Sequence, residues 1–252
     1  MTRLAILSDI HGNLPALQAV LADVDRRTGG RDVQIVTLGD HLSGPLWPEE
    51  TATLLRSRTD WVQIAGNHER QLLDFDPVRR GPSDRHAHAC LSPASRDWLT
   101  TLPTRAWLTP DILLCHGTPD SDLTYWLDTV DATAPDGVRP ATEAEIRTRL
   151  GAVTADLILC GHTHLPRTVH LNEGPLIVNP GSVGLPAYTD DHPIPHKVAT
   201  GSPDARYALL DQTPEGWTVD LISLPYDTAL AAGQADRNAR PDWAQALRTG
   251  TL

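Results

Sequence analysis

The sequence has 252 residues, of which 40% are hydrophobic and 21% are charged, a composition typical of a globular protein with a sizeable core. Its net charge is −11 with histidine counted as neutral, which argues against general binding of nucleic acid or of an anionic membrane. No stretch approaches the roughly 20 apolar residues of a membrane span, and the first apolar run is too short for a signal peptide. An anionic substrate would need a local reversal of this negative field, which a bound divalent metal commonly provides.

The predicted strands are short aliphatic runs of the kind buried inside a sheet. Five of them are expected at residues 4–7, 33–38, 61–65, 112–115 and 157–160. Two shorter strands are expected at residues 168–171 and 176–178, and a hairpin is expected from residues 207–210 and 217–222 around a Pro-Glu-Gly turn.

The predicted helices alternate with the first strands. Apolar residues recur at helical spacing from Leu14 to about residue 26, with Asn13 as the N-cap. A second helix is expected over residues 47–58, and residues 70–104 are expected to be helical with proline and glycine interruptions. Thr142 and Glu145 have the spacing of a capping box that starts a further helix. The first 70 residues therefore predict a β-α-β-α-β unit with a largely parallel sheet.

The remaining segments predict one domain over residues 1–252. Its parts would be a catalytic core over about 1–184, a closing hairpin over about 205–225 and peripheral C-terminal helices over about 227–250. Residues 118–141 and 185–203 are rich in proline and polar residues and are expected to be loops, the second of them mobile. The three cysteines, Cys90, Cys115 and Cys160, are far apart, so we expect reduced thiols in a cytoplasmic protein.

Polar side chains with metal-binding chemistry follow all five main strands. Their motifs are Asp9-x-His11, Gly39-Asp40, Gly66-Asn67-His68-Glu69, His116-Gly117 and Gly161-His162-Thr163-His164. The carboxyl ends of strands are where open α/β sheets hold their active sites. One histidine at a strand end is usually a core or loop residue, but five such ends in succession indicate a shared site.

The types of these residues restrict which metal ions could bind. Carboxylate, amide and imidazole groups suit Mn²⁺, Fe, Zn²⁺, Ni²⁺ or Co²⁺, and no set of thiolates is present for a structural zinc. Seven such groups are too many for one ion with an open position. They fit two ions about 3.5–4 Å apart that share a bridging carboxylate.

The ordered set of motifs resembles the calcineurin-like metallophosphoesterase superfamily. Within it, the chain is similar to small bacterial and archaeal phosphodiesterases that continue as Asp-Ile-His-Gly-Asn and Asn-Pro-Gly-Ser, and the match runs from about residue 4 to residue 184. The resemblance implies an α/β fold, a four-layer α-β-β-α sandwich of two mixed sheets flanked by helices. It also implies two divalent transition-metal ions, with manganese expected first and Fe, Zn, Ni or Co as alternatives.

Carried over position by position, the resemblance implies two sets of ligands that share Asp40. One ion would be held by Asp9, His11, Asp40 and His164, and the other by Asp40, Asn67, His116 and His162. A metal-bridging hydroxide would attack phosphorus. His68 would protonate the leaving group or bind a phosphoryl oxygen.

The residues after Asp40 differ from those of one branch of the superfamily, the protein Ser/Thr phosphatases. These phosphatases carry an aspartate three residues after the bridging aspartate, which orients the histidine, and an arginine soon after. Here Asp40 is followed by His41, Leu42 and then Ser43-Gly44-Pro45. This argues against a phosphoprotein phosphatase and weakens the case for His68 as the proton donor.

The resulting hypothesis is a dinuclear-metal phosphodiesterase that acts on a small phosphodiester, with nucleotides and cyclic nucleotides among the candidates. The alternatives are a small-molecule or nucleotide phosphomonoesterase, a non-catalytic scaffold of the same fold, and a nuclease, which the acidic charge disfavours. Asn13 and His41 are weak candidates for substrate binding. No membrane partner and no strong nucleic-acid binding are expected, and a homo-oligomer is compatible with the sequence.

Overall fold

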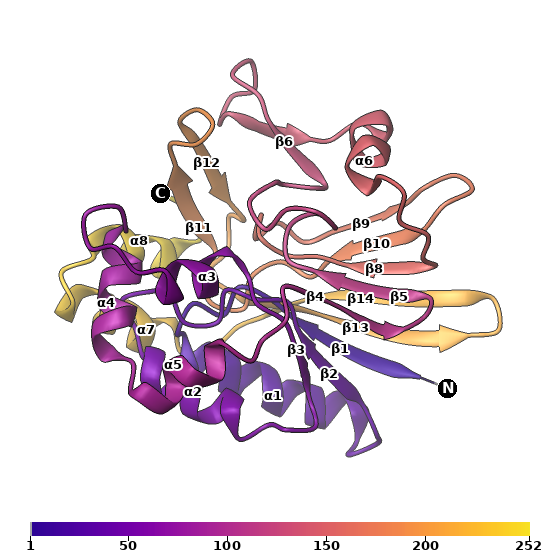
Figure 1. Cartoon of the computed structure of the whole chain (residues 1–252). Coiled ribbons are helices and arrows are strands. Elements are labelled where there is room, and N and C mark those ends of the chain that lie inside the picture. The colour runs from indigo at the N-terminus through magenta and orange to yellow at the C-terminus, as the bar shows by residue number, and fades with distance from the viewer. Residues whose placement is uncertain (1) are drawn as a thin grey trace.

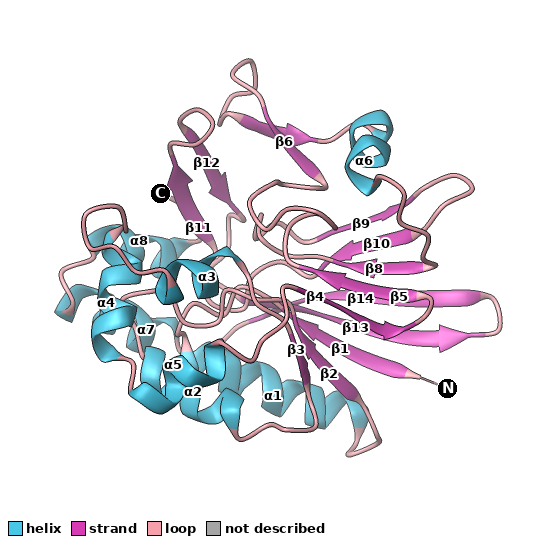
Figure 2. Ribbon diagram, viewed as in Figure 1, coloured by secondary structure: helices cyan, strands magenta, loops and turns pink. Residues whose placement is uncertain are grey.

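Two five-stranded sheets packed face to face form the centre of the computed structural model, which describes residues 2–252 (Figure 1). Helices cover the outer faces, so the predicted four-layer α-β-β-α sandwich is confirmed (Figure 2). The helices are α1 (Leu14–Thr28), α2 (Pro48–Arg56), α3 (Asn67–Leu73), α4 (Pro82–Cys90), α5 (Pro93–Leu99), α6 (Glu143–Leu150), α7 (Thr228–Arg237) and α8 (Pro241–Thr249).

The first sheet has the order β14-β13-β1-β2-β3 and contains the predicted parallel unit. The closing hairpin pairs antiparallel with β1 and completes this sheet. Its strands are β1 (Arg3–Leu7), β2 (Gln34–Thr37), β3 (Val62–Gln63), β13 (Ala205–Thr213) and β14 (Gly216–Leu224).

The second sheet has the order β4-β5-β8-β10-β9, with three parallel central strands and antiparallel strands at both edges. Its strands are β4 (Arg105–Thr109), β5 (Ile112–Cys115), β8 (Leu157–Leu159), β9 (Arg167–His170) and β10 (Leu176–Asn179). The edge strand β4 was not predicted, because its alternating exposed and half-buried residues give no continuous apolar run.

The core between the sheets follows from the alternation of side chains along each strand. Leu4 and Ile6 of β1 face the second sheet, where they meet residues such as Leu114 and Leu159. Ala5 and Leu7 of the same strand point the other way and pack against the helical layer that contains α1 and α2. A strand buried on both faces needs a continuous apolar sequence, which is why β1 could be recognised.

The helix starts follow the predicted capping chemistry. The Asn13 side chain accepts a hydrogen bond from the Ala16 amide at 3.2 Å. At α6, the Thr142 hydroxyl accepts from the Glu145 amide and the Glu145 carboxylate accepts from the Thr142 amide, which confirms the capping box. These contacts fix where the two helices begin.

Two segments that the sequence indicated as loops contain strands instead. Residues 118–141 include β6 (Asp128–Val130) and β7 (Val138–Pro140), and residues 185–203 include β11 (Ala187–Asp190) and β12 (His196–Ala199). The loop predictions missed these four short strands, because cross-strand pairing outweighed a polar, proline-rich composition. In Figure 1, β11 and β12 stand beside β6 above the two sheets.

The two C-terminal helices, α7 and α8, each bury one face against the rest of the protein. Trp243 and Leu247 of α8 are buried in a cluster with Leu46 and Leu185, which lie next to the strand-end motifs. The sequence did not indicate these contacts, because the partners of α8 lie in loops far away in the chain. No helix within residues 2–252 is both long and apolar enough to cross a membrane.

Candidate metal centre

The strand-end motifs meet at one edge of the sandwich. Two groups of buried or half-buried side chains form there, and within each group one ligand atom per residue lies within 4.8 Å of the others. The first group is Asp9, His11 and His164, and the second is Asp40, His116 and His162. Asn67, the seventh predicted ligand, begins α3 and lies against His116.

In the first group, two imidazole nitrogens face each other. The Nε2 atoms of His11 and His164 are 3.1 Å apart, and Nε2 of His164 is 3.3 Å from Oδ1 of Asp9. In the second group, Nε2 of His116 lies 3.1 Å from both Oδ2 of Asp40 and Oδ1 of Asn67. Both groups therefore gather nitrogen and oxygen ligand atoms at short range.

The orientation of three histidines makes these atoms acceptors. Nδ1 of His11, His116 and His164 lies 2.7–2.8 Å from a backbone carbonyl oxygen, that of Ser43, Leu38 and Leu185 respectively. A carbonyl can only accept, so each Nδ1 carries a proton, and whenever one of these rings is neutral its Nε2 lone pair is turned to the centre. Lone pairs facing lone pairs and carboxylates repel unless a cation or a proton lies between them.

A buried carboxylate oxygen of Asp9 also favours a cation at this centre. Oδ1 of Asp9 is inaccessible to solvent and has no hydrogen-bond partner among residues 2–252. A buried unpaired carboxylate oxygen is costly, whereas coordination of a cation would satisfy it. The residues present therefore fit divalent metal ions with borderline nitrogen and oxygen ligands.

The backbone at the centre is held in an uncommon conformation. Asp9, His11, Asp40, His162 and His164 all have φ between 52° and 71°, the left-handed region that costs a non-glycine residue energy. The backbone is also closely packed here: a Cβ added to Gly161 would lie only 2.8 Å from Oδ2 of Asp9. Because these five residues keep a costly backbone conformation, the surrounding contacts must be strong enough to hold it in place.

Glu69 holds the loop that carries Asp40. Its buried carboxylate accepts hydrogen bonds from the backbone amides of Asp40, His41 and Gly66 at 2.7–2.8 Å. The sequence motif contained Glu69 but gave no role for it. These bonds fix the ends of β2 and β3 relative to each other.

His68 lies at the rim of the centre. Its side chain is 27% exposed, against 3% for that of Asp40, and its Nε2 is 4.0 Å from Oδ2 of Asp40. Burial opposes charge on the imidazole, but Asp40 and then Asp84 outweigh burial and raise the pKa of His68 to about 9. Nε2 of this ring is turned toward the Asp40 carboxylate at the edge of the centre.

The two weak candidates for substrate binding have partners inside the protein. Asn13 is fully buried and its amide nitrogen donates to the Gly184 carbonyl and to the Tyr226 hydroxyl at 2.9 Å. His41 is fully buried as well, with Nε2 2.8 Å from the Thr37 hydroxyl and Nδ1 3.4 Å from Glu69. This geometry supports structural roles for both side chains.

Aromatic residues that sequence reasoning did not place at the centre lie against its histidines. The Tyr188 ring of β11 is 4.7 Å from the His164 ring, and the Tyr125 ring is 5.1 Å from the His162 ring. The two tyrosine hydroxyls are 2.5 Å apart. The Trp243 ring of α8 lies edge-on to His11 at 5.9 Å. No local pattern could reveal these contacts, because each joins segments far apart in the sequence.

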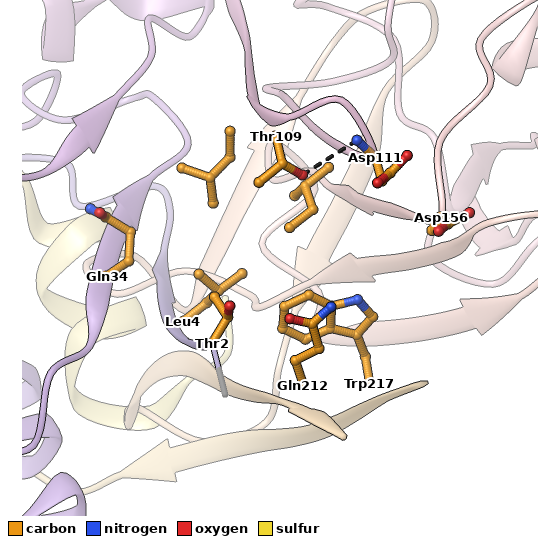
Figure 3. Close-up of a pocket in the computed structure, with 10 residues that line it drawn as sticks. Thr2, Leu4, Gln34, Thr109, Asp111, Asp156, Gln212 and Trp217 are labelled. Carbon is orange, nitrogen blue, oxygen red and sulfur yellow. Dashed lines mark hydrogen bonds between the residues drawn. The ribbon is translucent and has the colours of Figure 1, made fainter. Parts of the chain in front are cut away.

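A cavity of about 420 Å³ lies at the opposite edge of the sandwich, near the beginnings of the strands (Figure 3). Leu4, Gln34 and Trp217 line it, and the Thr109 hydroxyl accepts a bond from the Asp111 amide there at 3.3 Å. None of the seven predicted ligands lines this cavity. The metal chemistry and the cavity are therefore separate features.

Comparison with known proteins agrees with this geometry. The family model for calcineurin-like phosphoesterases matches residues 2–166, well over half of the sequence. The chain belongs to the calcineurin-like phosphoesterase family. An uncharacterized protein of Methanocaldococcus jannaschii is 24% identical over 262 residues, which cover 95% of this chain and 94% of that protein.

Solved structures share the whole fold. A metallophosphoesterase from Sphaerobacter thermophilus is 24% identical with a TM-score of 0.72, and a hypothetical protein from Pyrococcus horikoshii is 18% identical with a TM-score of 0.73. Each comparison covers 99% of both chains. Family and fold together indicate a metal-dependent phosphoester hydrolase, and the two His/Asp groups are its candidate metal sites.

Binding of divalent metal is expected to release protons and to tighten as the pH rises. Burial opposes charge on His116, but Asp40 outweighs it and raises the pKa to about 10 in the metal-free protein. At neutral pH this imidazole therefore carries a proton that the metal must displace. By contrast, burial lowers the pKa of His11 and of His162 to about 4, so these two rings are already neutral.

Calorimetric titration with Mn²⁺ in buffers of different ionisation enthalpy would measure this proton release. Repeating the titration from pH 6 to 8 would give the slope of affinity against pH. An affinity independent of pH, without proton release, would contradict the expectation.

Proposed function

We propose that the protein is a dinuclear-metal phosphodiesterase that hydrolyses a small phosphodiester, with nucleotides and cyclic nucleotides as candidates. The observation that carries the proposal is the buried cluster of acceptor atoms at the strand ends, with His68 at its rim. Such a cluster suits two cations that share a carboxylate. Mn²⁺ is the proposed ion, with Fe, Zn²⁺, Ni²⁺ and Co²⁺ as alternatives.

The proposed ligand sets overlap at Asp40. One ion would contact Asp9, His11, Asp40 and His164, and the other would contact Asp40, Asn67, His116 and His162. The short distances from His116 to Asp40 and Asn67 support the second set, and the unpaired oxygen of Asp9 supports the first. When bound, the ions would neutralise phosphoryl charge and make a water acidic enough to act as the nucleophile.

His68 is the proposed general acid. Its ring is half-buried and its Nε2 faces Asp40, so a leaving-group oxygen at the centre would lie within reach of its proton. The backbone amide of His68 donates to Oδ1 of Asp40 at 2.9 Å, which ties the proton donor to a proposed metal ligand. Proton donation matters most when the leaving group is a poor one.

A small diester is favoured over a phosphoprotein by the chain that follows Asp40. Ser43, Gly44 and Pro45 occupy the stretch where a protein phosphatase would carry its aspartate and arginine. Gly44 is also covered by the Trp243 ring of α8, and a Cβ at this glycine would lie 2.8 Å from that ring. This packing leaves no room for a larger side chain at Gly44, beside the backbone of the proposed ligand His11.

The test is an assay of metal-depleted protein to which Mn²⁺ is restored. The substrates are bis-4-nitrophenyl phosphate, 4-nitrophenyl phosphate, and 2′,3′- and 3′,5′-cyclic nucleotides. We expect turnover of the diesters with Mn²⁺ and none after chelation, and Asp40→Asn protein purified in parallel measures any contaminating activity.

Other outcomes of the assay would replace the proposal. Faster turnover of the monoester than of every diester would indicate a phosphomonoesterase. No turnover with Mn²⁺, nor when the assay is repeated with Fe²⁺, Zn²⁺, Ni²⁺ and Co²⁺, would favour a non-catalytic scaffold of the same fold. Cleavage of single-stranded DNA in preference to small diesters would indicate a nuclease.

A further inference from the structure

His68 is held in place by Asp84, a residue of α4 that no strand-end motif contains. Nδ1 of His68 donates to Oδ1 of Asp84 over 2.7 Å, a short distance typical of a charge-assisted hydrogen bond. Asp84 is only 4% exposed, so water competes little for this bond. Because Nδ1 is engaged, the free nitrogen Nε2 is the one that faces Asp40 and the centre.

Asp84 is itself fixed by a second buried contact. The Ser43 hydroxyl donates to the same Oδ1 atom at 2.7 Å, and Ser43 is fully buried. The backbone carbonyl of Ser43 accepts from Nδ1 of His11 at 2.7 Å. One residue therefore orients both a proposed metal ligand and the carboxylate that holds His68.

The helix that carries Asp84 is anchored from another part of the chain. Asp84 lies in the first turn of α4, where the free backbone amides favour a negative charge. The neighbouring Ser83 hydroxyl accepts a bond from Nη1 of Arg240 at 2.9 Å, which links α4 to the start of α8. The bond to Arg240 therefore anchors the turn of α4 that carries Asp84.

We propose that Asp84 is the positioning residue for His68, and that Ser43 holds Asp84 in that role. The inference rests on the proposed function, in which His68 protonates the leaving group. In that step a water oxygen bonds to phosphorus and the bond to the leaving oxygen breaks. The attacking water has already released one proton to the solvent, so it reacts as hydroxide. The leaving oxygen keeps the electron pair of the broken bond and takes the proton from Nε2, while Nδ1 keeps its own proton, hydrogen-bonded to Asp84.

The first test is Asp84→Asn in the full-length, Mn²⁺-loaded protein, assayed on two diesters. With methyl phenyl phosphate, whose leaving groups need protonation, we expect kcat to fall about 10- to 100-fold, part of the roughly 10²–10⁴-fold that a general acid contributes. With bis-4-nitrophenyl phosphate the loss should be several-fold smaller. KM, metal content and the unfolding midpoint should stay close to those of the wild type.

Matched variants separate positioning from a structural effect. Asp97→Asn removes an exposed acid from the adjacent helix α5 and should change nothing. Ser43→Ala should reproduce the same dependence on the leaving group with a smaller loss, and Asp84→Glu should recover part of kcat. Equal losses on both diesters together with lost metal would assign Asp84 a purely structural role and overturn the proposal.

The second test needs no substrate. In a ¹H–¹⁵N spectrum of ring nitrogens, the wild type should show a downfield, slowly exchanging Nδ1 proton that is absent from both His68→Asn and Asp84→Asn. If the wild type turns over no phosphoester, the proposed function fails and this signal alone decides whether Asp84 positions His68. Persistence of the signal and of kcat in Asp84→Asn would overturn the inference while the function stands.

Discussion

Replacing Asp40 by asparagine is expected to empty both halves of the metal centre and to abolish hydrolysis of phosphoesters. The carboxylate is 3% exposed and lies 3.1 Å from His116, while its other oxygen accepts from the His68 amide. Residues that only support a metal ligand typically cost 10–100-fold in affinity when mutated, and loss of a shared ligand should exceed this. Metal content per chain after dialysis against Mn²⁺, together with the diester assay, measures both effects.

A matched control is Asp211→Asn. Asp211 pairs with Arg3 on the first sheet and belongs to neither metal group. This variant should keep two ions per chain and full activity. If Asp40→Asn also kept two ions at the wild-type affinity, Asp40 would not be the bridging ligand. Loss of one ion only would assign Asp40 to a single site.

Replacing His68 by alanine is expected to remove most activity and to leave both ions in place. His68 belongs to neither group of potential ligands, and alanine keeps the backbone amide that donates to Asp40. The loss of a general acid should lower kcat by roughly 10²–10⁴-fold on a diester with a poor leaving group. Metal analysis and kcat on methyl phenyl phosphate and on bis-4-nitrophenyl phosphate check this expectation.

The control for this variant is His86→Ala on α4. Nε2 of His86 lies 3.5 Å from Sγ of Cys90, and His86 is in neither metal group. The His86→Ala variant should have the same kcat and the same metal content as the wild type. Metal loss in His68→Ala, absent from His86→Ala, would show that His68 is a ligand and not the proton donor.

The position of Asp84 explains how this chain can do without the aspartate that protein phosphatases carry three residues after the bridging aspartate. Ser43 stands at that place, and its hydroxyl reaches Asp84, which in turn reaches His68. No spacing rule could reveal this, because the carboxylate lies 41 residues beyond Ser43 on a helix of a different segment. The missing aspartate weakened the case for His68 in the sequence, and the hydrogen bond to Asp84 takes its place in the folded chain.

The sequence by itself determined the fold class and selected the residues that the structure gathers at one edge. Short aliphatic runs marked β1, β2, β5 and β8, and each run was followed by the polar side chains that now form the two groups. This worked because parallel strands buried on both faces have continuous apolar sequences, and because the carboxyl ends of parallel strands in one sheet lie at the same edge. The packing of the two sheets then brings the edge of β1 and β2 beside the edge of β5 and β8. The ligand roles of these residues stay a proposal that the Asp40 variant tests.

Only the tertiary structure decided how the neighbours of these residues are arranged. His41 follows Asp40 in the chain, yet its ring turns inward to Thr37 and Glu69. Tyr188 and Trp243 come from a predicted loop and a predicted peripheral helix, yet both rings lie against histidines of the centre. The physical reason is that these contacts depend on side-chain direction and on pairing between distant segments. Local propensity and spacing carry information about neither.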